Sequence, residues 1–482
     1  MRLIGRKYEI DIMQSYVESD KPEFVVVYGR RRVGKTYLIK EFFENDFCFY
    51  CTGRVNEYEE EKPLEALKRQ LSAFHEALEK FGKTDFEQKE NWFDSFLQLE
   101  KLITDSPKQG KKVIFIDEMP WLDTPNSGFL SAFEYFWNSF ACARSDILLI
   151  ACGSATSWIV KKLFENTGGL FNRVTKRMHL KPFTLAETES YFKEKGIAMN
   201  RYQIIESYMV FGGIPYYLDL FEKKYGLAQN IDLLCFGDDA LLKNEYRSLF
   251  ATLFNNAENH HKIVLTLASK ASGLTREEIA EEAKLLNNGH LTETLKDLEL
   301  CGFIRKYRAF GKKGKGAVFQ LIDPFALFYN KFLRTGEIND PDYWAKGYGG
   351  GTHNAWRGYA FEQVCLSHEL QIRQALGIGG VVANISSWRR SSKVSGEGAQ
   401  IDLIIDRADG VINLCEIKFA VREFEITKEY CEKLEKKVLA FSNETKTNKA
   451  LHTTLITTYG VKRNKYYYAV HSEVEMDSLF AV

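Results

Sequence analysis

A glycine-rich stretch near the start of the chain carries the residue types needed to hold a phosphate chain. It reads FVVVYGRRRVGKTYLIKEFF, with Gly29, four further residues, and then Gly34, Lys35 and Thr36. Glycines let backbone N–H groups close around phosphate oxygens, a lysine here reaches the terminal phosphates, and the hydroxyl faces Mg²⁺. The stretch predicts a nucleoside triphosphate site with Mg²⁺. The residues expected to contact the nucleotide are Gly29, Arg30, Arg31, Arg32, Val33, Gly34, Lys35, Thr36 and Tyr37.

Polar residues that end two later apolar runs have the chemistry for hydrolysis. Asp117 and Glu118 end the run KKVIFIDE. Asp117 would hold Mg²⁺, and Glu118 would orient and deprotonate the attacking water. Ser154, at the end of SDILLIACGS, could sense the terminal phosphate, with Thr156 as an alternative, although a helix cap explains either equally well. The sequence contains no Asn-Lys-x-Asp element for guanine, so we expect ATP.

A second group of charged residues lies in two apolar runs joined by a turn, GAQIDLIIDRADGVINLCEIKFA. Strand side chains alternate between faces, so Asp402 and Gln400 share one face, and so do Glu416 and Lys418. ADG is a hairpin signal that would bring Asp402 beside Glu416. Paired carboxylates repel unless a cation lies between them, and Mg²⁺ accepts such ligands while keeping waters for a phosphate. Lys418 would then orient or deprotonate a metal-bound water. The alternative is an ordinary salt bridge on a half-exposed sheet.

The elements that must position the first group are buried parallel strands. Residues 24–28 and 113–116 are continuous apolar runs, and the run before Ser154 is a third. In α/β sheets ligands bind at the carboxyl ends of the strands, which is where the polar residues stand. The first part of the chain is therefore predicted to be a parallel α/β sheet.

From about residue 260 the pattern changes to three short helices and a β-hairpin, which predicts a winged helix. Thr275 and Glu278 have the spacing of a capping box. The hairpin is basic, through Arg305, Lys306, Arg308, Lys312, Lys313 and Lys315. Such a patch could neutralise DNA phosphates, but acidic residues in the third helix oppose it, and a spacer or protein-binding role is an equal alternative.

Several motifs of the first half resemble the archaeal-type P-loop ATPases, relatives of the AAA+ and STAND classes. They are LIGRKYEI, GRRRVGKTYLI, FIDEMPWL, CGSATSW, LFNRVTKRMHLKPFTLAE and FGGIPYYL. The resemblance implies that residues 4–6 lie near the adenine and that residues 212–215 lie at the hinge of a helical lid. It also implies that Arg173 acts as an arginine finger, in trans if the protein is a homo-oligomer, with Arg177 as the alternative. Asn172 departs from the glycine that many relatives carry before this arginine.

The order helix with Glu362, Asp402 strand, Glu416-x-Lys418 strand, helix resembles the PD-(D/E)XK restriction-endonuclease-like nucleases. The resemblance implies that Asp402 and Glu416 are metal ligands, that Glu362 is an auxiliary ligand and that Lys418 is catalytic. Ile401 stands where the family pattern has proline.

We predict an α/β protein composed of a P-loop NTPase parallel sheet with a helical lid, a winged helix-turn-helix and a C-terminal restriction-endonuclease-like α/β domain. The predicted domains are 1–184 for the ATPase core, 185–255 for the lid, 256–335 for the winged helix, 336–354 for a linker and 355–482 for the nuclease-like domain. The chain of 482 residues is long enough for several cores.

Composition narrows the functional class. The 65 basic and 65 acidic residues balance, so nucleic-acid affinity must come from local patches. No apolar run is long enough to span a bilayer, and the nine cysteines are scattered, so we expect a cytoplasmic protein with no membrane segment. The leading hypothesis is an ATP-hydrolysing switch that controls a Mg²⁺-dependent nuclease acting on DNA. The alternatives are a regulatory DNA-binding ATPase whose terminal domain does not cut, and an ATP-driven oligomeric signalling scaffold.

Overall fold

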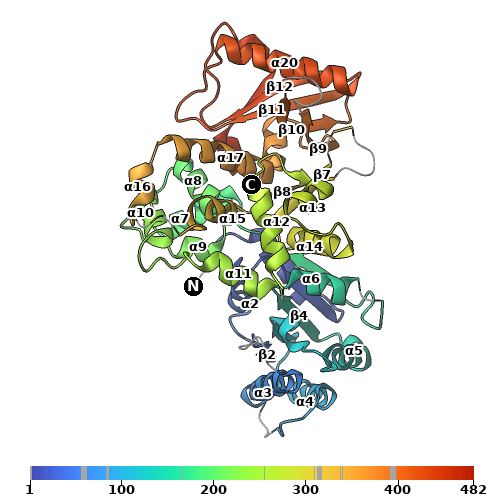
Figure 1. The fold of residues 1–482 in the computed structure, drawn as a ribbon. Helices are drawn as coiled ribbons and strands as arrows, with labels where there is room; N and C mark the ends of the chain where they lie inside the picture. Colours follow the sequence, from blue (N-terminus) through green and yellow to red (C-terminus); the bar gives the residue numbers. More distant parts are fainter. Residues whose placement is uncertain are drawn as a thin grey trace. The chain divides into compact units, whose positions relative to one another are not determined.

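The computed structural model describes residues 3–55, 62–82, 86–165, 167–254, 256–308, 310–311, 317–336, 338, 340–390 and 398–482. The chain divides into two compact units, Met1–Pro182 and Phe183–Val482 (Figure 1). The division falls close to residue 184, where the predicted ATPase core ends. Among the helices of the described ranges, none has both the length and the apolar character needed to cross a membrane.

Unit 1 is built on a parallel sheet of five strands in the order β2-β3-β4-β1-β5. The strands are β1 Glu23–Tyr28, β2 Phe49–Thr52, β3 Lys112–Asp117, β4 Ile147–Gly153 and β5 Lys176–His179. All residues of β3 and β4 are buried, as the continuous apolar runs predict. The parallel ladder pairs Tyr28 with Gly153 and Thr52 with Asp117. The loops that follow β1, β3 and β4 therefore meet at one edge of the sheet.

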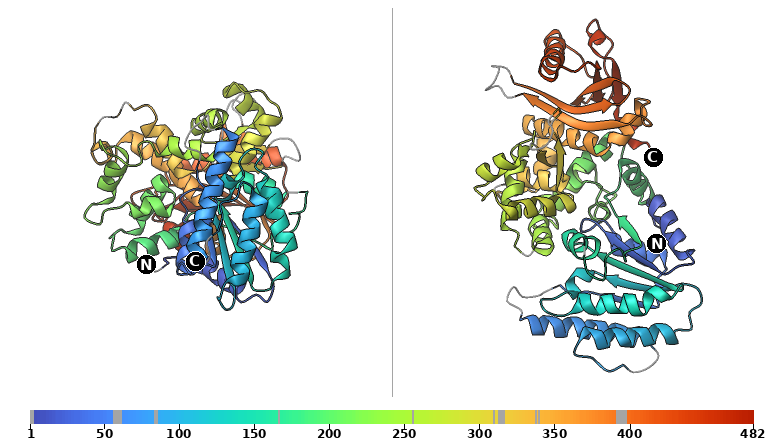
Figure 2. Two further views of the ribbon diagram at one scale, coloured as in Figure 1. Left: turned by 90° about the horizontal axis from the view of Figure 1, so that it is seen from below. Right: turned by 90° about the vertical axis from the view of Figure 1, so that its right-hand side faces the viewer.

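Aromatic helices cover this sheet. The helices of unit 1 are α1 Lys7–Val17, α2 Lys35–Phe42, α3 Pro63–Phe81, α4 Trp92–Asp105, α5 Phe129–Ser139 and the short α6 Thr156–Ile159. Figure 2 shows α3, α4 and α5 layered on one side of the strands. Phe24 of β1 contacts Phe133 and Trp137 of α5, with ring centroids 5.4 and 5.2 Å apart. This apolar contact holds the layer against β1.

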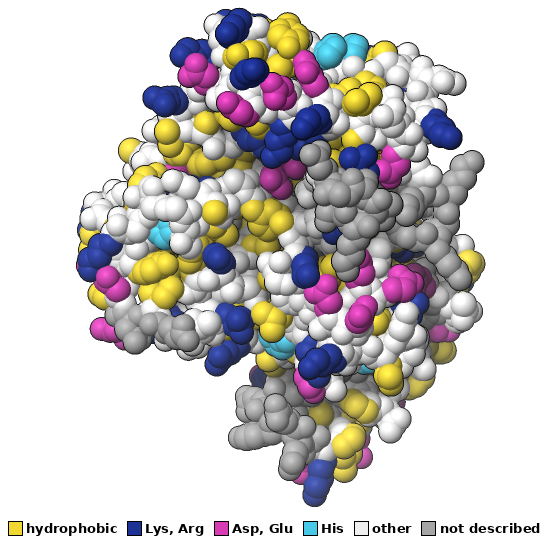
Figure 3. All heavy atoms as spheres, turned by 45° about the horizontal axis from the view of Figure 1, so that its top comes forward, with side chains coloured by type: hydrophobic (Ala, Val, Ile, Leu, Met, Phe, Trp, Pro, Cys, Tyr) yellow, Lys and Arg dark blue, Asp and Glu magenta, His cyan; other side chains and the backbone are white. Residues whose placement is uncertain are grey.

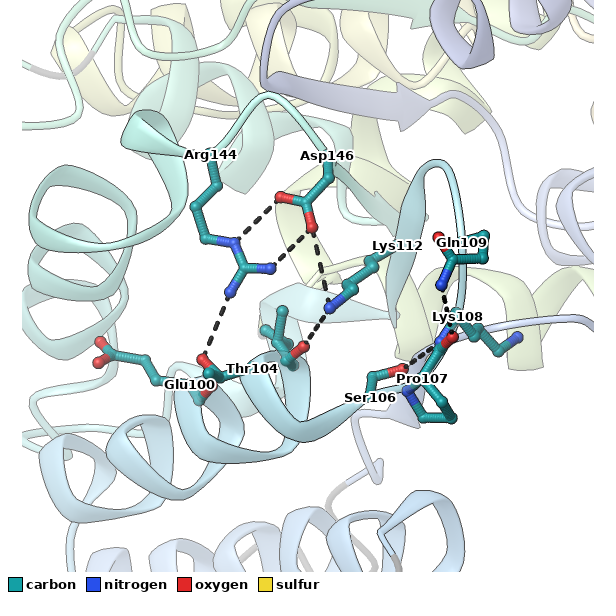
Figure 4. Close-up of polar contacts among 10 residues, drawn as sticks. Glu100, Thr104, Ser106, Pro107, Lys108, Gln109, Lys112, Arg144 and Asp146 are labelled. Carbon is teal, nitrogen blue, oxygen red and sulfur yellow. Dashed lines mark hydrogen bonds and ion pairs between the residues drawn. The ribbon is translucent and has the colours of Figure 1, made fainter.

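A charged network ties α4 to the amino ends of β3 and β4, at the edge of the sheet opposite the strand-end loops (Figure 4). Arg144 donates to both carboxylate oxygens of Asp146, at 3.0 and 2.7 Å. The hydrogen bonds from Arg144 lower the pKa of Asp146. Lys112 donates to the carbonyl of Ile103 at 2.8 Å, and its Nζ lies 3.8 Å from Asp146. We interpret this network as structural, because it lies away from the edge where α/β sheets bind ligands.

Unit 2 begins with five helices in the region predicted as a lid. They are α7 Leu185–Glu194, α8 Arg201–Phe211, α9 Pro215–Asp219, α10 Leu227–Cys235 and α11 Glu245–Leu253. Gly212 and Gly213 separate α8 from α9, and both have a left-handed φ of 65°. A Cβ on Gly213 would lie 2.3 Å from the carbonyl oxygen of Phe183, so only glycine fits there.

Three helices and a small antiparallel sheet follow. The helices are α12 Glu258–Ala268, α13 Arg276–Glu282 and α14 Gly289–Leu300, and the strands β6 Leu274–Thr275, β7 Ile304–Arg308 and β8 Ala317–Leu321 have the order β6-β8-β7. The predicted capping box at the start of α13 is present: the Thr275 hydroxyl accepts from the backbone of Glu278, and the Glu278 carboxylate accepts from the backbone of Thr275. Lys312, Lys313 and Lys315 lie outside the described residues.

The last part of the chain is a mixed sheet of five strands with the order β13-β12-β11-β10-β9. The strands are β9 Ala383–Arg390, β10 Ala399–Arg407, β11 Val411–Lys418, β12 Ala450–Thr457 and β13 Ser472–Glu475. The pair β10–β11 is antiparallel, as the turn signal predicts, and so is β9–β10, while the other two pairs are parallel. Figure 1 shows α20 (Lys428–Thr445) on one side of this sheet and α17 (Gly351–Ser367) on the other.

The segment 336–354, predicted as a linker, contains packed structure. It includes the short helix α16 Tyr343–Gly347, and α17 already begins at Gly351. Trp344 is buried, and the backbone N–H groups of Trp344 and Ala345 donate to the Asp232 carboxylate of α10 at 2.7 and 2.9 Å. The glycines between residues 349 and 351 therefore join two packed helices rather than forming a free hinge.

The lid helices also contact the terminal elements within unit 2. The backbone N–H of Leu185 donates to Nε2 of His368, which lies just before α18 (Glu369–Ala375), at 3.1 Å. The ring of Tyr202 on α8 stacks on Phe419 at 4.9 Å. These contacts join the first helices of unit 2 to its last part, although the sequence predicts that the two belong to separate domains.

Candidate functional site

The phosphate-binding loop between β1 and α2 has the strained backbone that its glycines allow. Gly29, Arg32 and Gly34 have φ angles of 141°, 71° and 89°. A Cβ on Gly29 would lie 2.3 Å from the carbonyl oxygen of Leu180, so a larger residue cannot occupy this position. Lys35 donates from Nζ to the carbonyls of Gly29 and Arg30 at 2.9 and 3.0 Å. The lysine ammonium is thus held over the loop, where a phosphate chain would lie.

Thr36 and Asp117, the two predicted Mg²⁺ ligands of this site, lie together. The Thr36 hydroxyl is 3.0 Å from each carboxylate oxygen of Asp117. Asp117 Oδ1 also accepts from the thiol of Cys152 at 2.7 Å. Burial raises the pKa of Asp117, and the neighbouring charge of Glu118 raises it further. A hydroxyl and a carboxylate in contact at a phosphate-binding loop are oxygen donors of the kind Mg²⁺ prefers, so these residues fit that ion.

Glu118 and Ser154 are joined in the same way. The Glu118 carboxylate accepts from the backbone N–H of Ser154 at 3.1 Å and from its hydroxyl at 3.0 Å. Glu118 itself has a left-handed φ of 46°, which is uncommon outside glycine and is typical of residues held for a function. Ser154 therefore orients the side chain predicted to activate water.

Arg6, which directly precedes α1, supports the loop through a contact that the sequence does not predict. It is buried, and its Nη2 donates to the carbonyl of Val33 at 3.1 Å. Arg6 and Gly5 both have left-handed backbone angles, with φ of 59° and 68°. The segment before α1 thus turns sharply onto the loop, the region that the resemblance places near the adenine.

The remaining predicted residues of unit 1 differ in exposure. Within the loop, Arg30 and Val33 are buried, Arg31 and Arg32 are half-buried, and Tyr37 is exposed. Thr156 is fully buried, and its hydroxyl donates to the carbonyl of Ser154 at 3.4 Å, as a helix-start contact does.

The two finger candidates are both exposed. Arg173 donates from Nε to the carbonyl of Gly169 at 3.4 Å, and the Arg177 guanidinium lies over the ring of Phe164 at 4.2 Å. Asn172, before Arg173, has a left-handed φ of 55°.

In unit 2, the antiparallel ladder brings Asp402 beside the end of β11. The ladder pairs Leu403 with Cys415, so the preceding residue of β10 lies level with Glu416. Asp402 Oδ2 accepts a hydrogen bond from the backbone N–H of Ile417 at 3.2 Å. Glu416 is buried, and its Oε2 lies 3.7 Å from Nζ of Lys418. The structure therefore gathers Asp402, Glu416 and Lys418 at one place.

The electrostatics of this cluster also include Glu362 of α17. Burial raises the pKa of Glu362, and the charge of Asp402 raises it further, while Lys418 opposes this rise. Burial and Asp402 likewise raise the pKa of Glu416. Glu362, Asp402 and Glu416 thus share one region with the ammonium of Lys418, and carboxylates this close repel one another unless a cation lies between them.

A metal ion at this cluster would be coordinated by two carboxylates, those of Asp402 and Glu416. Across the described ranges, no three acidic, histidine or cysteine side chains stand close enough to form a metal-binding group. Asp402 and Glu416 fit Mg²⁺, which takes one or two protein carboxylates and keeps several waters. Glu362, predicted as an auxiliary ligand, lines a cavity of about 180 Å³ together with Asp402 and Gln400.

Two residues of α20 belong to this cluster and escape sequence reasoning. Lys437 Nζ lies 2.6 Å from Glu416 Oε1. The ring of Tyr430 lies 5.8 Å from Lys418 Nζ, and burial, Glu416 and Asp402 raise the pKa of its phenol. One signal was available: Lys437 stands three residues after Leu434 and four before Phe441, on the apolar stripe of the helix. A lysine on such a stripe indicates a buried acidic partner.

The basic hairpin, for which the sequence leaves open DNA contact and a spacer or protein-binding role, packs against the terminal sheet. Arg305 donates from Nε to the side-chain oxygen of Gln320 at 2.9 Å, and burial lowers its pKa. The ring of Phe310 lies 4.9 Å from that of Phe441 on α20, and its backbone N–H donates to the carbonyl of Ser387 on β9 at 3.1 Å. In the described part of the hairpin, Lys306 is the exposed basic side chain.

Comparisons with known proteins agree with the geometry of unit 1. Residues 3–221 match the model of the ATPase domain found predominantly in Archaea. An uncharacterized protein of Methanocaldococcus jannaschii, MJECL04, is 24% identical over 412 residues, which cover 83% of each chain. An uncharacterized ATP-binding protein of the same organism, MJ0423, is 45% identical over 42 residues, 9% of this chain and 71% of that protein.

Among solved structures, the Walker-type ATPase PABY2304 of Pyrococcus abyssi matches 68% of this chain and 96% of its own, with 17% identity and a TM-score of 0.49. The family match covers every element of the phosphate-binding site described above, from Arg6 to Ser154. Over residues 3–221 this chain is similar to the ATPase domain found predominantly in Archaea.

Proposed function

We propose that this protein is a switch in which ATP hydrolysis in unit 1 controls a Mg²⁺-dependent, nuclease-like centre of unit 2 that acts on DNA. ATPase function rests on the domain match and on the loop. The nuclease half rests on one observation: Asp402 of β10 lies beside Glu416 and Lys418 at the end of the neighbouring strand β11. The winged-helix-like segment 256–335 lies between these centres in the sequence.

In the ATPase centre, the loop N–H groups and Lys35 would bind the phosphate chain, and Thr36 with Asp117 would hold Mg²⁺. The ion would neutralise charge on the β- and γ-phosphate oxygens. Glu118, oriented by Ser154, would take a proton from water as the water oxygen bonds to the γ-phosphorus. The bond to the bridging oxygen breaks at the same time, and ADP leaves with the electron pair.

In the nuclease-like centre, Asp402 and Glu416 would hold Mg²⁺, which would supply a polarised water and charge neutralisation. Lys418 would orient the water and stabilise charge on the phosphate oxygens. The new bond would join the water oxygen to phosphorus while Lys418 takes the proton of the water, and the bond to the leaving sugar oxygen would break, so that this oxygen leaves with the electron pair and accepts a proton from solvent. Glu362, kept close to its neutral form by its raised pKa, is placed to adjust the charge of this centre.

A second candidate function, DNA binding without cleavage, is favoured by the Lys437–Glu416 ion pair. A lysine that already neutralises Glu416 reduces the attraction for a metal ion. In that case the terminal domain would bind nucleic acid with a strong salt dependence and leave it intact.

Plasmid cleavage separates the two functions. Purified protein is incubated with plasmid, linear DNA and RNA in Mg²⁺, with and without ATP. The wild type should cut at least one substrate, the Lys418→Ala variant should cut none, and the Lys35→Ala variant should lose the response to ATP. If the wild type and Lys418→Ala behave alike on every substrate, the nuclease half of the proposal is lost.

A further inference from the structure

The ammonium of Lys437 occupies the place beside Glu416 that a divalent cation would need. Its Nζ lies 2.6 Å from one carboxylate oxygen, while Lys418 lies 3.7 Å from the other. Glu416 is 3% exposed, so water does little to weaken this contact. A buried carboxylate held by a lysine at this distance gives up that partner only if another cation replaces it.

Helix packing alone does not explain a lysine at this position. Cys431, Leu434 and Phe441 are the buried residues of the same α20 stripe, and an apolar side chain would continue it. Replacing a buried ion pair by apolar residues is often neutral or stabilising. Lys437 is therefore better explained by what its charge does at the cluster than by stability.

Lys437 also lines an open cavity on its other side. This cavity, of about 550 Å³, lies between α20 and the sheet edge at Arg390 and Ala399. Lys433 and Lys436 line it too, one helical turn apart on an exposed face of α20. Figure 3, which turns the α20 side of unit 2 toward the viewer, shows Lys and Arg side chains there among Asp and Glu side chains.

The cavity is not uniformly basic, because Glu429 and Glu432 line it as well. Its positive charge comes from Lys433, Lys436 and Lys437, so a chain of phosphates would bind along these lysines. A phosphodiester that enters there meets Lys437 within reach of Glu416. The long lysine side chain can exchange one anionic partner for the other without movement of the helix.

We propose that Lys437 is an exchangeable cation that couples metal binding to phosphodiester binding in the candidate centre. The inference rests on the proposed function of that centre. Without a ligand, Lys437 neutralises Glu416 and opposes the metal. A phosphodiester in the α20 cavity draws Lys437 away and frees Glu416 for the metal, so each ligand strengthens the binding of the other.

Binding measurements test this without any catalysis. Mn²⁺ binding to the nucleotide-free protein is followed by electron paramagnetic resonance, alone and with a short oligodeoxynucleotide that has nuclease-resistant linkages. The Asp402→Asn variant identifies the binding that belongs to this centre. In the wild type, the oligonucleotide should tighten Mn²⁺ binding by about fivefold or more. A parallel measurement uses inorganic phosphate in place of the oligonucleotide. It shows whether a free phosphate ion tightens Mn²⁺ binding as well as a polynucleotide does.

The Lys437→Met variant should bind Mn²⁺ alone roughly tenfold more tightly, the size expected for loss of a competing charged hydrogen bond, and should lose the coupling. Lys437→Gln gives a second neutral variant if the first folds poorly, as judged by circular dichroism. Lys436→Met is the matched control, because Lys436 lines the same cavity without contacting Glu416. It should weaken oligonucleotide binding and leave the affinity for Mn²⁺ alone unchanged.

The outcomes separate this inference from the function on which it rests. Equal Mn²⁺ affinity in the wild type and Lys437→Met, with loss in Asp402→Asn, would overturn the role of Lys437 and leave the carboxylate centre standing. Absence of Mn²⁺ binding in every variant would remove both. The expected binding pattern together with uncut DNA would support the coupling and overturn the nuclease.

Discussion

Nε of Arg357 lies 2.9 Å from Oε1 of Glu206, and this ion pair joins α17 to α8 inside unit 2. Both side chains are buried. The hydroxyl of Tyr348 donates to the other oxygen of Glu206 at 2.7 Å, and its ring lies 4.1 Å from the Arg357 guanidinium. Because α8 belongs to the predicted ATPase lid, the pair joins this lid to the helix that carries Glu362.

Removal of one partner of this pair should be costly. Arg357→Met leaves Glu206 charged and buried without its cation, and we expect a loss of about 3–5 kcal/mol in the free energy of unfolding. Urea denaturation measures this loss. The double variant Arg357→Met, Glu206→Gln should recover a large part of it, because no unpaired charge remains. A loss below about 1 kcal/mol in the single variant would show that the pair is not a structural joint.

Glu118 should be required for hydrolysis and not for binding. Glu118→Gln keeps the shape of the side chain but cannot accept a proton, so kcat should fall by roughly 10²–10⁴-fold with little change in ATP affinity. Ser154→Ala removes only the group that orients Glu118, so its effect should be smaller, on the order of tenfold. Phosphate release measures the rate, and calorimetry measures binding. Loss of ATP binding in Glu118→Gln would contradict the assigned role.

Replacement of Glu362 should stabilise the metal-free protein at alkaline pH. The pKa of Glu362 is higher in the folded than in the unfolded chain, because of burial first and then Asp402. The folded state therefore binds more protons, and stability falls as pH rises from the unfolded pKa through the raised one. Glu362→Gln lacks this loss. It should match the wild type near pH 5 and exceed it near pH 9 by on the order of 1 kcal/mol, roughly 2–4 °C in Tm.

Thermal unfolding in a chelating buffer at both pH values measures this difference. Asp409→Asn is a suitable control, since Asp409 is exposed and its pKa is lowered by the hydrogen bond from Arg407. That variant should not gain stability at high pH. An equal gain for Glu362→Gln at both pH values would mean that the replacement acts through packing and not through charge.

Arg173 should act on ATP held by another copy of the chain if the finger assignment is right. The wild-type rate per chain would then rise with protein concentration, and Arg173→Ala would lower kcat by about 10³-fold or more. Mixing Arg173→Ala with Glu118→Gln should restore part of the activity, because each variant supplies what the other lacks. A larger loss in Arg177→Ala, with Arg173→Ala active, would transfer the role to Arg177.

The sequence by itself determined the features that depend on short stretches of chain. The loop from Gly29 to Thr36 is one contiguous motif, and its conformation follows from its glycines and the strand before it. The contact of Thr36 with Asp117 was also predictable, because carboxyl ends of parallel strands share one edge. The pairing of β10 with β11 followed from side-chain alternation and a turn, which placed Asp402 beside Glu416.

Only the tertiary structure decided which distant groups complete each site. The position of Lys437 on the apolar stripe of α20 indicated a buried acidic partner, but it did not identify that partner as Glu416. Nothing local indicated that Arg6 would hold the loop carbonyl of Val33. The same holds for the docking of Phe310 on α20 and for the packing of Trp344 in a segment read as a linker. Such contacts depend on which helix covers which face. The helix that covers each face is determined by the total apolar surface that the whole chain buries on folding. No short stretch of sequence encodes that total.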